Sequence, residues 1–145
     1  MRIAFAGTLV ALSLAASAQS ETPAGLWTTY SDRTGEADGL VRIVEVNGEF
    51  EGTVLRVFSP PAPSANPLCE ECSGELRDKP IVGMKILRGL RRDGDGFSGG
   101  EILDPDEGRV YRCSMRLVDG GRRLEVRGYI GIALFGRTQV WDRQD

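Results

Sequence analysis

The chain has 145 residues, a formal net charge of −3 and no histidine. The slight acidic excess, without a basic stripe, argues against nucleic-acid binding. The absence of histidine excludes Ser-His-Asp and Cys-His catalytic arrangements and removes the commonest zinc ligand, so we expect a protein that is not an enzyme and has no catalytic residues.

The first eighteen residues have the composition of a secretory signal peptide. Arg2 is a positive start, residues 3–16 form an apolar run, and Ala16-Ser17-Ala18 is an A-x-A cleavage site. The run is shorter than the ~20 apolar residues that span a bilayer. We therefore expect a signal peptide over residues 1–18, a single β-barrel domain over residues 19–145, and an exported protein that does not span the membrane.

The rest of the sequence consists of short alternating runs separated by turns that contain most of the nineteen glycines. This spacing indicates an all-β protein without a long helix. The expected strands are residues 25–30, 40–46, 49–58, 81–92, 97–103, 109–118, 122–129 and 134–143. Eight antiparallel strands with short turns are enough to close an up-and-down barrel; a β-sandwich is the alternative.

The first expected strand opens with Gly25-Leu26-Trp27, which resembles the start of lipocalin- and avidin-like barrels. In such barrels the Trp closes one end and packs under a basic residue near the C-terminus. Trp27 is therefore expected to pack under Arg137 or Arg143, in a cation–π contact of about 0.5–2 kcal/mol.

Two of the later strands carry the candidate ligand-facing residues. In residues 109–118, Tyr111, Cys113, Met115 and Leu117 share one face, which a period of two places inside the barrel. In residues 134–143 the face shared by Phe135, Arg137, Gln139 and Trp141 mixes aromatic and polar side chains. Such a face lines a partly hydrated cavity or forms an outer wall. The candidate ligand-facing residues are Tyr111, Met115, Phe135, Gln139 and Trp141.

Residues 59–80 form a long irregular segment with five prolines: Pro60, Pro61, Pro63, Pro67 and Pro80. Long loops in compact domains are usually functional or disordered. We expect this one to be a lid or rim over the mouth of the barrel, or an extended segment that binds a partner protein.

The same segment contains Cys69-Glu70-Glu71-Cys72. A thioredoxin-like motif would need a helix after the first Cys, haem attachment would need a His after the second, and zinc shared with Cys113 would lack a fourth ligand. A disulfide between Cys69 and Cys72 is favoured in an oxidising compartment, with Cys113 buried and reduced.

Two glycine-containing turns have competing interpretations. Asp104, Asp106 and Glu107 offer carboxylates for calcium or for acid/base catalysis, but further ligands are missing and the Asp-Pro and closing Gly favour a simple turn. Residues 128–136 contain three glycines and no charge; they form either a tight bend or a rim that contacts a ligand.

As a set, these pieces resemble an exported bacterial family, the domain of unknown function 2147. The residues that carry the resemblance are Gly25-x-Trp27, Cys69-x-x-Cys72, Gly83-Met84-Lys85-Ile86-Leu87, Gly99-Gly100-x-Ile102-Leu103-Asp104-Pro105, Gly108-x-x-Tyr111, Arg127-Gly128-Tyr129 and Phe135-Gly136-Arg137-Thr138-x-x-Trp141. The resemblance covers residues 24–143. It implies a small calycin-like barrel in the envelope of Gram-negative bacteria, without an established activity.

The sequence therefore predicts a periplasmic barrel that binds a small apolar or amphipathic molecule. The alternative is a non-enzymatic envelope accessory protein that acts through another protein. No metal, cofactor or nucleic acid is expected as a partner.

Overall fold

The computed structural model describes residue 11 and residues 22–58, 66–132 and 134–144. In these ranges the chain forms eight strands and two short 3-10 helices, whose order is β1 (Gly25–Tyr30), β2 (Ala37–Val46), β3 (Glu49–Val57), η1 (Gly74–Leu76), β4 (Lys85–Asp93), β5 (Gly96–Asp104), β6 (Arg109–Val118), η2 (Asp119–Gly121), β7 (Arg123–Tyr129) and β8 (Gly136–Arg143). The expected signal peptide, apart from Ala11, lies outside the described residues, as do Pro60, Pro61 and Pro63.

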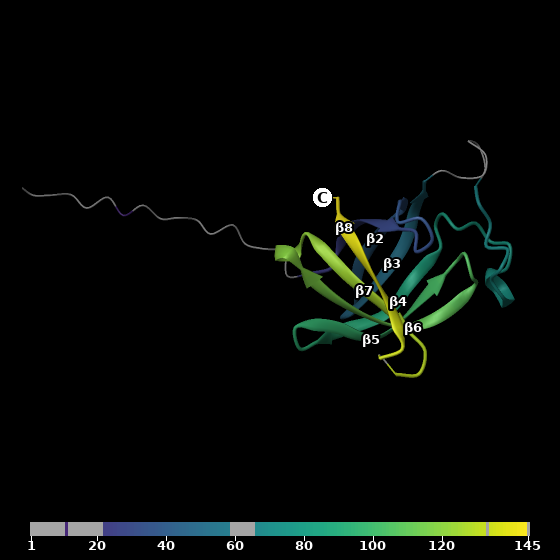
Figure 1. The fold of residues 1–145 in the computed structure, drawn as a ribbon. Helices are drawn as coiled ribbons and strands as arrows, with labels where there is room; N and C mark the ends of the chain where they lie inside the picture. The colour runs from purple at the N-terminus through teal and green to yellow at the C-terminus, as the bar shows by residue number, and fades with distance from the viewer. Residues whose placement is uncertain (1–10, 12–21, 59–65, 133, 145) are drawn as a thin grey trace, which may run out of the picture.

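The strands form one closed barrel in chain order (Figure 1). Each strand pairs antiparallel with the next, and β8 pairs with β1. The expected eight-stranded up-and-down barrel is confirmed, and the β-sandwich alternative is wrong. Among the described residues, no helix is long and apolar enough to cross a membrane.

The period-two alternation of β6 shows how sequence sets the two faces of the wall. Cys113 and Met115 are buried in the core, whereas Arg112 and Arg116, which flank this pair in the sequence, are exposed. Cys113 pairs with Gly128 and Met115 pairs with Val126, so the inner face of β6 continues into the inner face of β7. The expectation that Tyr111, Cys113, Met115 and Leu117 share the inward face agrees with this register.

Two strands begin later than expected, because turns replace their first residues. Residues 81–84 form a turn in which the Met84 N–H donates to the Ile81 carbonyl at 3.0 Å, so β4 begins at Lys85. The Phe135 N–H donates to the Ile132 carbonyl at 3.1 Å, so β8 begins at Gly136. Phe135, which we expected to share one face of the last strand with Arg137, Gln139 and Trp141, therefore lies outside β8 and is exposed.

The seam between β1 and β8 closes the barrel through Trp27 and Arg143. These two residues are paired across the seam, and the Arg143 guanidinium lies 4.3 Å from the centroid of the Trp27 ring. Arg143 also donates to the carbonyl oxygens of Ala24, Thr22 and Gly121, each at 2.8 Å. The Trp27 indole N–H donates to the Pro23 carbonyl at 2.8 Å, so residues 22–24 are held across this end of the barrel.

Apolar side chains fill the barrel from this closed end. Phe50 and Phe97 meet edge to face, with ring centroids 5.1 Å apart. The largest fully buried side chains from the strands are Trp27, Val41, Ile43, Leu87, Leu90, Cys113, Leu124 and Trp141. Burying a large apolar side chain contributes about 1.5–3 kcal/mol, so this packing is the main stabilising feature of the fold.

A second apolar layer lies outside the barrel, over β4 and β5. Leu87 and Ile102 are paired and face inward, so Ile86 and Leu103 face outward. Both are nevertheless buried, in the same core cluster as Cys69, Cys72 and Met84. We infer that residues 66–84 cover this part of the outer wall.

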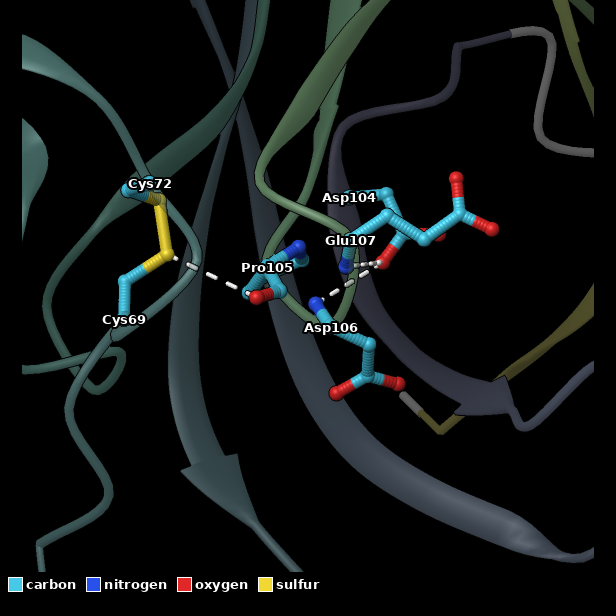
Figure 2. The surroundings of a disulfide bond; sticks show 6 residues. All are labelled: Cys69, Cys72, Asp104, Pro105, Asp106 and Glu107. Carbon is cyan, nitrogen blue, oxygen red and sulfur yellow. Dashed lines mark hydrogen bonds between the residues drawn. A yellow bond between two sulfur atoms is a disulfide. The ribbon is translucent and has the colours of Figure 1, made fainter.

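The covering segment is held against the turn between β5 and β6 by the Cys69–Cys72 disulfide loop (Figure 2). The Cys69 sulfur lies 3.5 Å from the Pro105 carbonyl oxygen. Gly108 has a φ of +66°, and a Cβ at this position would lie 1.8 Å from the carbonyl oxygen of Glu71. Only glycine allows the two backbones to approach so closely.

We predict that Gly108→Ala destabilises the fold more than the same substitution at a matched glycine. Gly94→Ala is the control, because Gly94 has a φ of +59° but nothing within 4 Å of a built Cβ. The left-handed conformation should cost each variant about 1–2 kcal/mol. Gly108→Ala should lose about 1–3 kcal/mol more, because its methyl group displaces the disulfide loop. Urea denaturation measures both free energies of unfolding, and equal losses would contradict the proposed contact.

Candidate functional site

Polar side chains gather at the end of the barrel opposite Trp27, which we call the mouth. Along β8, Arg137, Gln139 and Trp141 face inward, because they pair with Gly128, Val126 and Leu124 of β7. Trp141 is buried deepest, and Arg137 lies nearest the rim. One strand therefore passes from the apolar core to a charged mouth.

A chain of hydrogen bonds runs along these inward side chains. The Trp141 indole N–H donates to the Gln139 side-chain oxygen at 2.9 Å, and the Gln139 amide donates to Asp32 at 2.9 Å. The second oxygen of Asp32 lies 3.3 Å from the Arg137 guanidinium. The buried Trp141 is thereby linked to the charged groups at the rim.

Arg137 is the centre of the mouth. Besides Asp32, its guanidinium lies 3.6 Å from Glu107 and 3.8 Å from Asp104, both in or beside the turn between β5 and β6. It also lies 6.0 Å from the centroid of the Tyr111 ring, and the Tyr111 hydroxyl donates to Glu107. Side chains from β5, β6 and β8, from the loop after β1 and from the turn between β5 and β6 therefore meet at one cation.

Gly128 makes this meeting of side chains feasible. It pairs with Arg137 across β7 and β8, and a Cβ built on it would lie 3.4 Å from the Tyr111 Cβ. Because no side chain occupies position 128, the Tyr111 and Ile102 side chains pack close to the Gly128 backbone, beside Arg137. Glycine inside a strand often marks such a close approach.

Carboxylates outnumber cations in the mouth, and burial disfavours the charge of Asp38 and Asp104. Burial raises the pKa of Asp104, although the backbone N–H groups of Asp106 and Glu107 donate to it (Figure 2). Burial likewise raises the pKa of Asp38, whose carboxylate accepts a bond from Thr29 and lies near other carboxylates. The mouth thus keeps acidic groups in an environment that costs stability.

The residues predicted from the sequence are divided between the two ends of the barrel. Trp27 and Arg143 meet at the closed end, and Gly25 opens β1 beside them, paired with Ile43. Arg137, the other predicted partner of Trp27, lies in the mouth. The expectation that it closes the barrel is corrected, because Arg143 is the residue paired with Trp27.

The predicted ligand-facing residues also separate by depth. Tyr111 and Gln139 lie in the mouth, whereas Met115 and Trp141 lie below them in the core. Phe135 lies outside the barrel, in the loop before β8. Sequence reasoning did not place Asp32 or Asp38 in the site. The mixed face of the last strand was the signal for Arg137. Asp32 lies in the loop after β1 and Asp38 near the start of β2, in a stretch between the expected strands that has no pattern.

The cysteines are placed as expected. Cys69 and Cys72 form a disulfide, and Cys113 is a buried free thiol whose pKa burial raises to about 12. Such a thiol stays protonated near neutral pH and is a poor nucleophile. In the part of the chain that the structure describes, no group of three or more Cys, Asp or Glu side chains is arranged to hold a metal ion.

An eight-stranded up-and-down barrel with a Trp–Arg contact at one end and a polar mouth at the other has a lipocalin-like fold. In agreement, the chain is similar to the structure of protein HP1028 from the human pathogen Helicobacter pylori, which is described as belonging to the lipocalin family. The two are 19% identical, the match covers 84% of this chain and 82% of that chain, and the TM-score is 0.73.

The sequence also matches, over residues 25–143, the family described as "Uncharacterized protein conserved in bacteria (DUF2147)". The chain therefore belongs to the DUF2147 family, which confirms the resemblance found in its sequence. No curated protein matches the chain.

We predict that Asp104→Asn changes how stability depends on pH. The pKa of Asp104 is raised above 3.8 in the folded protein, so the folded state binds more protons than the unfolded chain just above pH 3.8. Ionisation of Asp104 therefore lowers the free energy of unfolding as pH rises through this window. The variant lacks this titration, so its stability relative to the native protein should increase between about pH 3 and about pH 7.

Urea denaturation across this pH range tests the sign of the effect. Asp95→Asn, in the exposed turn between β4 and β5, is the control for the loss of a carboxylate away from the mouth. A decrease with pH for Asp104→Asn would mean that the carboxylate stabilises the mouth and would contradict the assignment.

Proposed function

We propose that the protein binds a small amphipathic molecule at the mouth, with the polar group of the ligand at Arg137 and Gln139. One observation carries this proposal. Inward-facing side chains are apolar in the core of the barrel and become charged and hydrogen-bonding toward the mouth. Ligand sites commonly combine an apolar wall with a few polar groups that fix orientation, and barrel mouths are among their usual places.

The ion pairs of Arg137 are of a kind that a ligand can exchange. They are 3.3–3.8 Å long, longer than tight charge-assisted hydrogen bonds, and the Arg137 side chain is half exposed. Exposed ion pairs contribute about 0–1 kcal/mol each. A polar ligand group can therefore replace one of these carboxylates, or pair with one of them, at small cost to the fold.

The apolar part of the ligand would lie against the Tyr111 ring, which packs beside Gly128 and lies 6.0 Å from the Arg137 guanidinium. Met115 and Trp141 fill the barrel below, so we propose a ligand held at the mouth rather than one enclosed deep in the barrel. We further propose that this role is binding without catalysis, since the site offers no histidine and its carboxylates surround a cation.

We also propose that the protein acts in the periplasm. The Cys69–Cys72 disulfide is typical of an oxidising compartment, and residues 1–18 have the pattern of a signal peptide. An envelope partner protein is the alternative role, and it would gain support if no amphiphile bound to the mouth.

We predict that the exported protein begins at Gln19. Its intact mass, measured on protein from the periplasm of a Gram-negative host, should lack residues 1–18 and be two hydrogens below that of the reduced chain. Ala18→Arg should block processing, because the A-x-A site requires a small residue, whereas Ala6→Val in the apolar run should leave processing intact. Normal cleavage of Ala18→Arg would contradict the assigned site.

We predict that at least one of three amphiphiles quenches the fluorescence of Trp141 in a saturable way. The probes are dodecanoate, dodecanol and dodecylamine, which share an alkyl chain and differ in head group. Trp141→Phe should remove the signal, which would show that the quenched fluorescence comes from Trp141 and not from Trp27 at the other end. Because Arg137 and Gln139 would hold the head group, Arg137→Met and Gln139→Leu should each weaken binding about tenfold, the equivalent of one lost polar contact. Arg116→Met, on the outer face of β6, is the matched control. Binding that is equal in all variants would contradict a site at the mouth.

A further inference from the structure

The loop between β7 and β8 exposes the most apolar surface of any described segment. We call residues 130–135 the apolar loop; Ala133 lies outside the described residues. Ile130 and Ile132 are 55% and 59% exposed, and Phe135 and Leu134 are 71% and 76% exposed. Apart from Val110, the other exposed large apolar side chains in the described ranges are only 37–45% exposed. In Figure 1 the apolar loop, coloured yellow-green, projects beyond the ends of the strands.

The apolar loop lies at the rim of the mouth. It follows β7 directly, and Arg137 comes two residues after its end. Val110, which is 55% exposed, extends the same surface, because Arg112 pairs with Tyr129 and so places the start of β6 beside the loop. Exposed apolar patches of this kind mark sites of interaction with a membrane or another protein.

Arginines lie on the outer wall directly behind the apolar loop. Arg112 and Arg127 face outward on β6 and β7, and Arg127 donates to the Leu134 carbonyl at 3.3 Å and to the Thr138 hydroxyl at 2.9 Å. Glu101 is the outward residue paired with Arg112. Farther from the loop, two other outward arginines form ion pairs, Arg116 with Glu125 and Arg123 with Asp142.

Three carboxylates at this end, Asp32, Asp104 and Glu107, contact Arg137 on the inner side of the rim. Asp106 is exposed and lies 4.0 Å from Arg33, and Glu70 and Glu71 are exposed in the disulfide loop. An apolar tip backed by arginines complements the surface of an anionic bilayer, where apolar side chains enter the headgroup region and arginines meet phosphates. A stable protein interface needs about 800 Å² from each partner, which a six-residue tip does not offer.

We propose that the apolar loop docks the mouth of the barrel on an anionic phospholipid surface. Ile132, Leu134 and Phe135 enter the headgroup region, and Arg112 and Arg127 lie at the level of the lipid phosphates. The proposal goes beyond ligand binding and does not depend on which molecule the barrel holds.

Vesicle co-sedimentation tests the proposal with the exported protein. The vesicles are phosphatidylcholine alone, or phosphatidylcholine with about one-third phosphatidylglycerol, at low salt. The native protein should bind the anionic vesicles several-fold better than the neutral ones, and added salt should reduce the difference. The double variant Leu134→Ser/Phe135→Ser should bind about tenfold less. Val44→Ser/Val46→Ser, on the exposed hairpin at the closed end, is the control and should bind like the native protein.

Three outcomes would overturn the proposal: no binding of the native protein to anionic vesicles, equal binding by the loop variant, or an equal loss in the control. Size-exclusion chromatography adds a fourth, because a loop variant that elutes as a smaller species would assign the loop to contacts between copies. Urea denaturation checks that each variant folds. Quenching of Trp141 by amphiphiles separates this inference from the proposed function, since docking can fail while ligand binding persists.

Discussion

Closure of the barrel depends on the seam between β1 and β8, which has only two paired positions in its register, Trp27 with Arg143 and Thr28 with Asp142. The side chains compensate for this short ladder. Arg143 stacks on Trp27 and binds three carbonyl oxygens, and the Tyr30 hydroxyl donates to Asp142. Charge-assisted hydrogen bonds of this kind are stronger than neutral ones, so one arginine holds β1, β8 and the residues before β1 together.

The same seam builds the mouth at the other end. Asp32 follows β1, and it reaches Gln139 and Arg137 only because β1 lies beside β8. With its period of two, β8 carries Arg143, Trp141, Gln139 and Arg137 on one face, from the closed end to the rim. Closure and the proposed binding site are therefore two ends of one strand, and a change in the register of the seam would alter both.

Local patterns in the sequence were sufficient for the strands but not for the roles of two arginines. Asn47-Gly48 marks a hairpin, and the alternation of β6 identifies its inner face, because both signals act between neighbouring residues. Arg137 and Arg143 lie on the same face of β8, so the alternation of the sequence does not distinguish them. Only the register between β1 and β8, which are separated by more than a hundred residues, decides which one meets Trp27. Phe135 continued the alternation, but the turn before β8 removed it from the inner face.

The disulfide segment shows why the mouth is better explained by function than by stability. Gly108 and the Cys69–Cys72 loop hold the turn that brings Asp104 and Glu107 to Arg137. Burial raises the pKa of Asp104, so its charge is kept there at a cost that the apolar core does not require. Proteins keep charged groups at positions where they reduce stability mainly when those groups have a functional role. Gly108 and the disulfide loop thus support the unfavourable charge of Asp104 beside the ion pairs of Arg137, which a ligand can exchange. This arrangement is the one expected of a binding site.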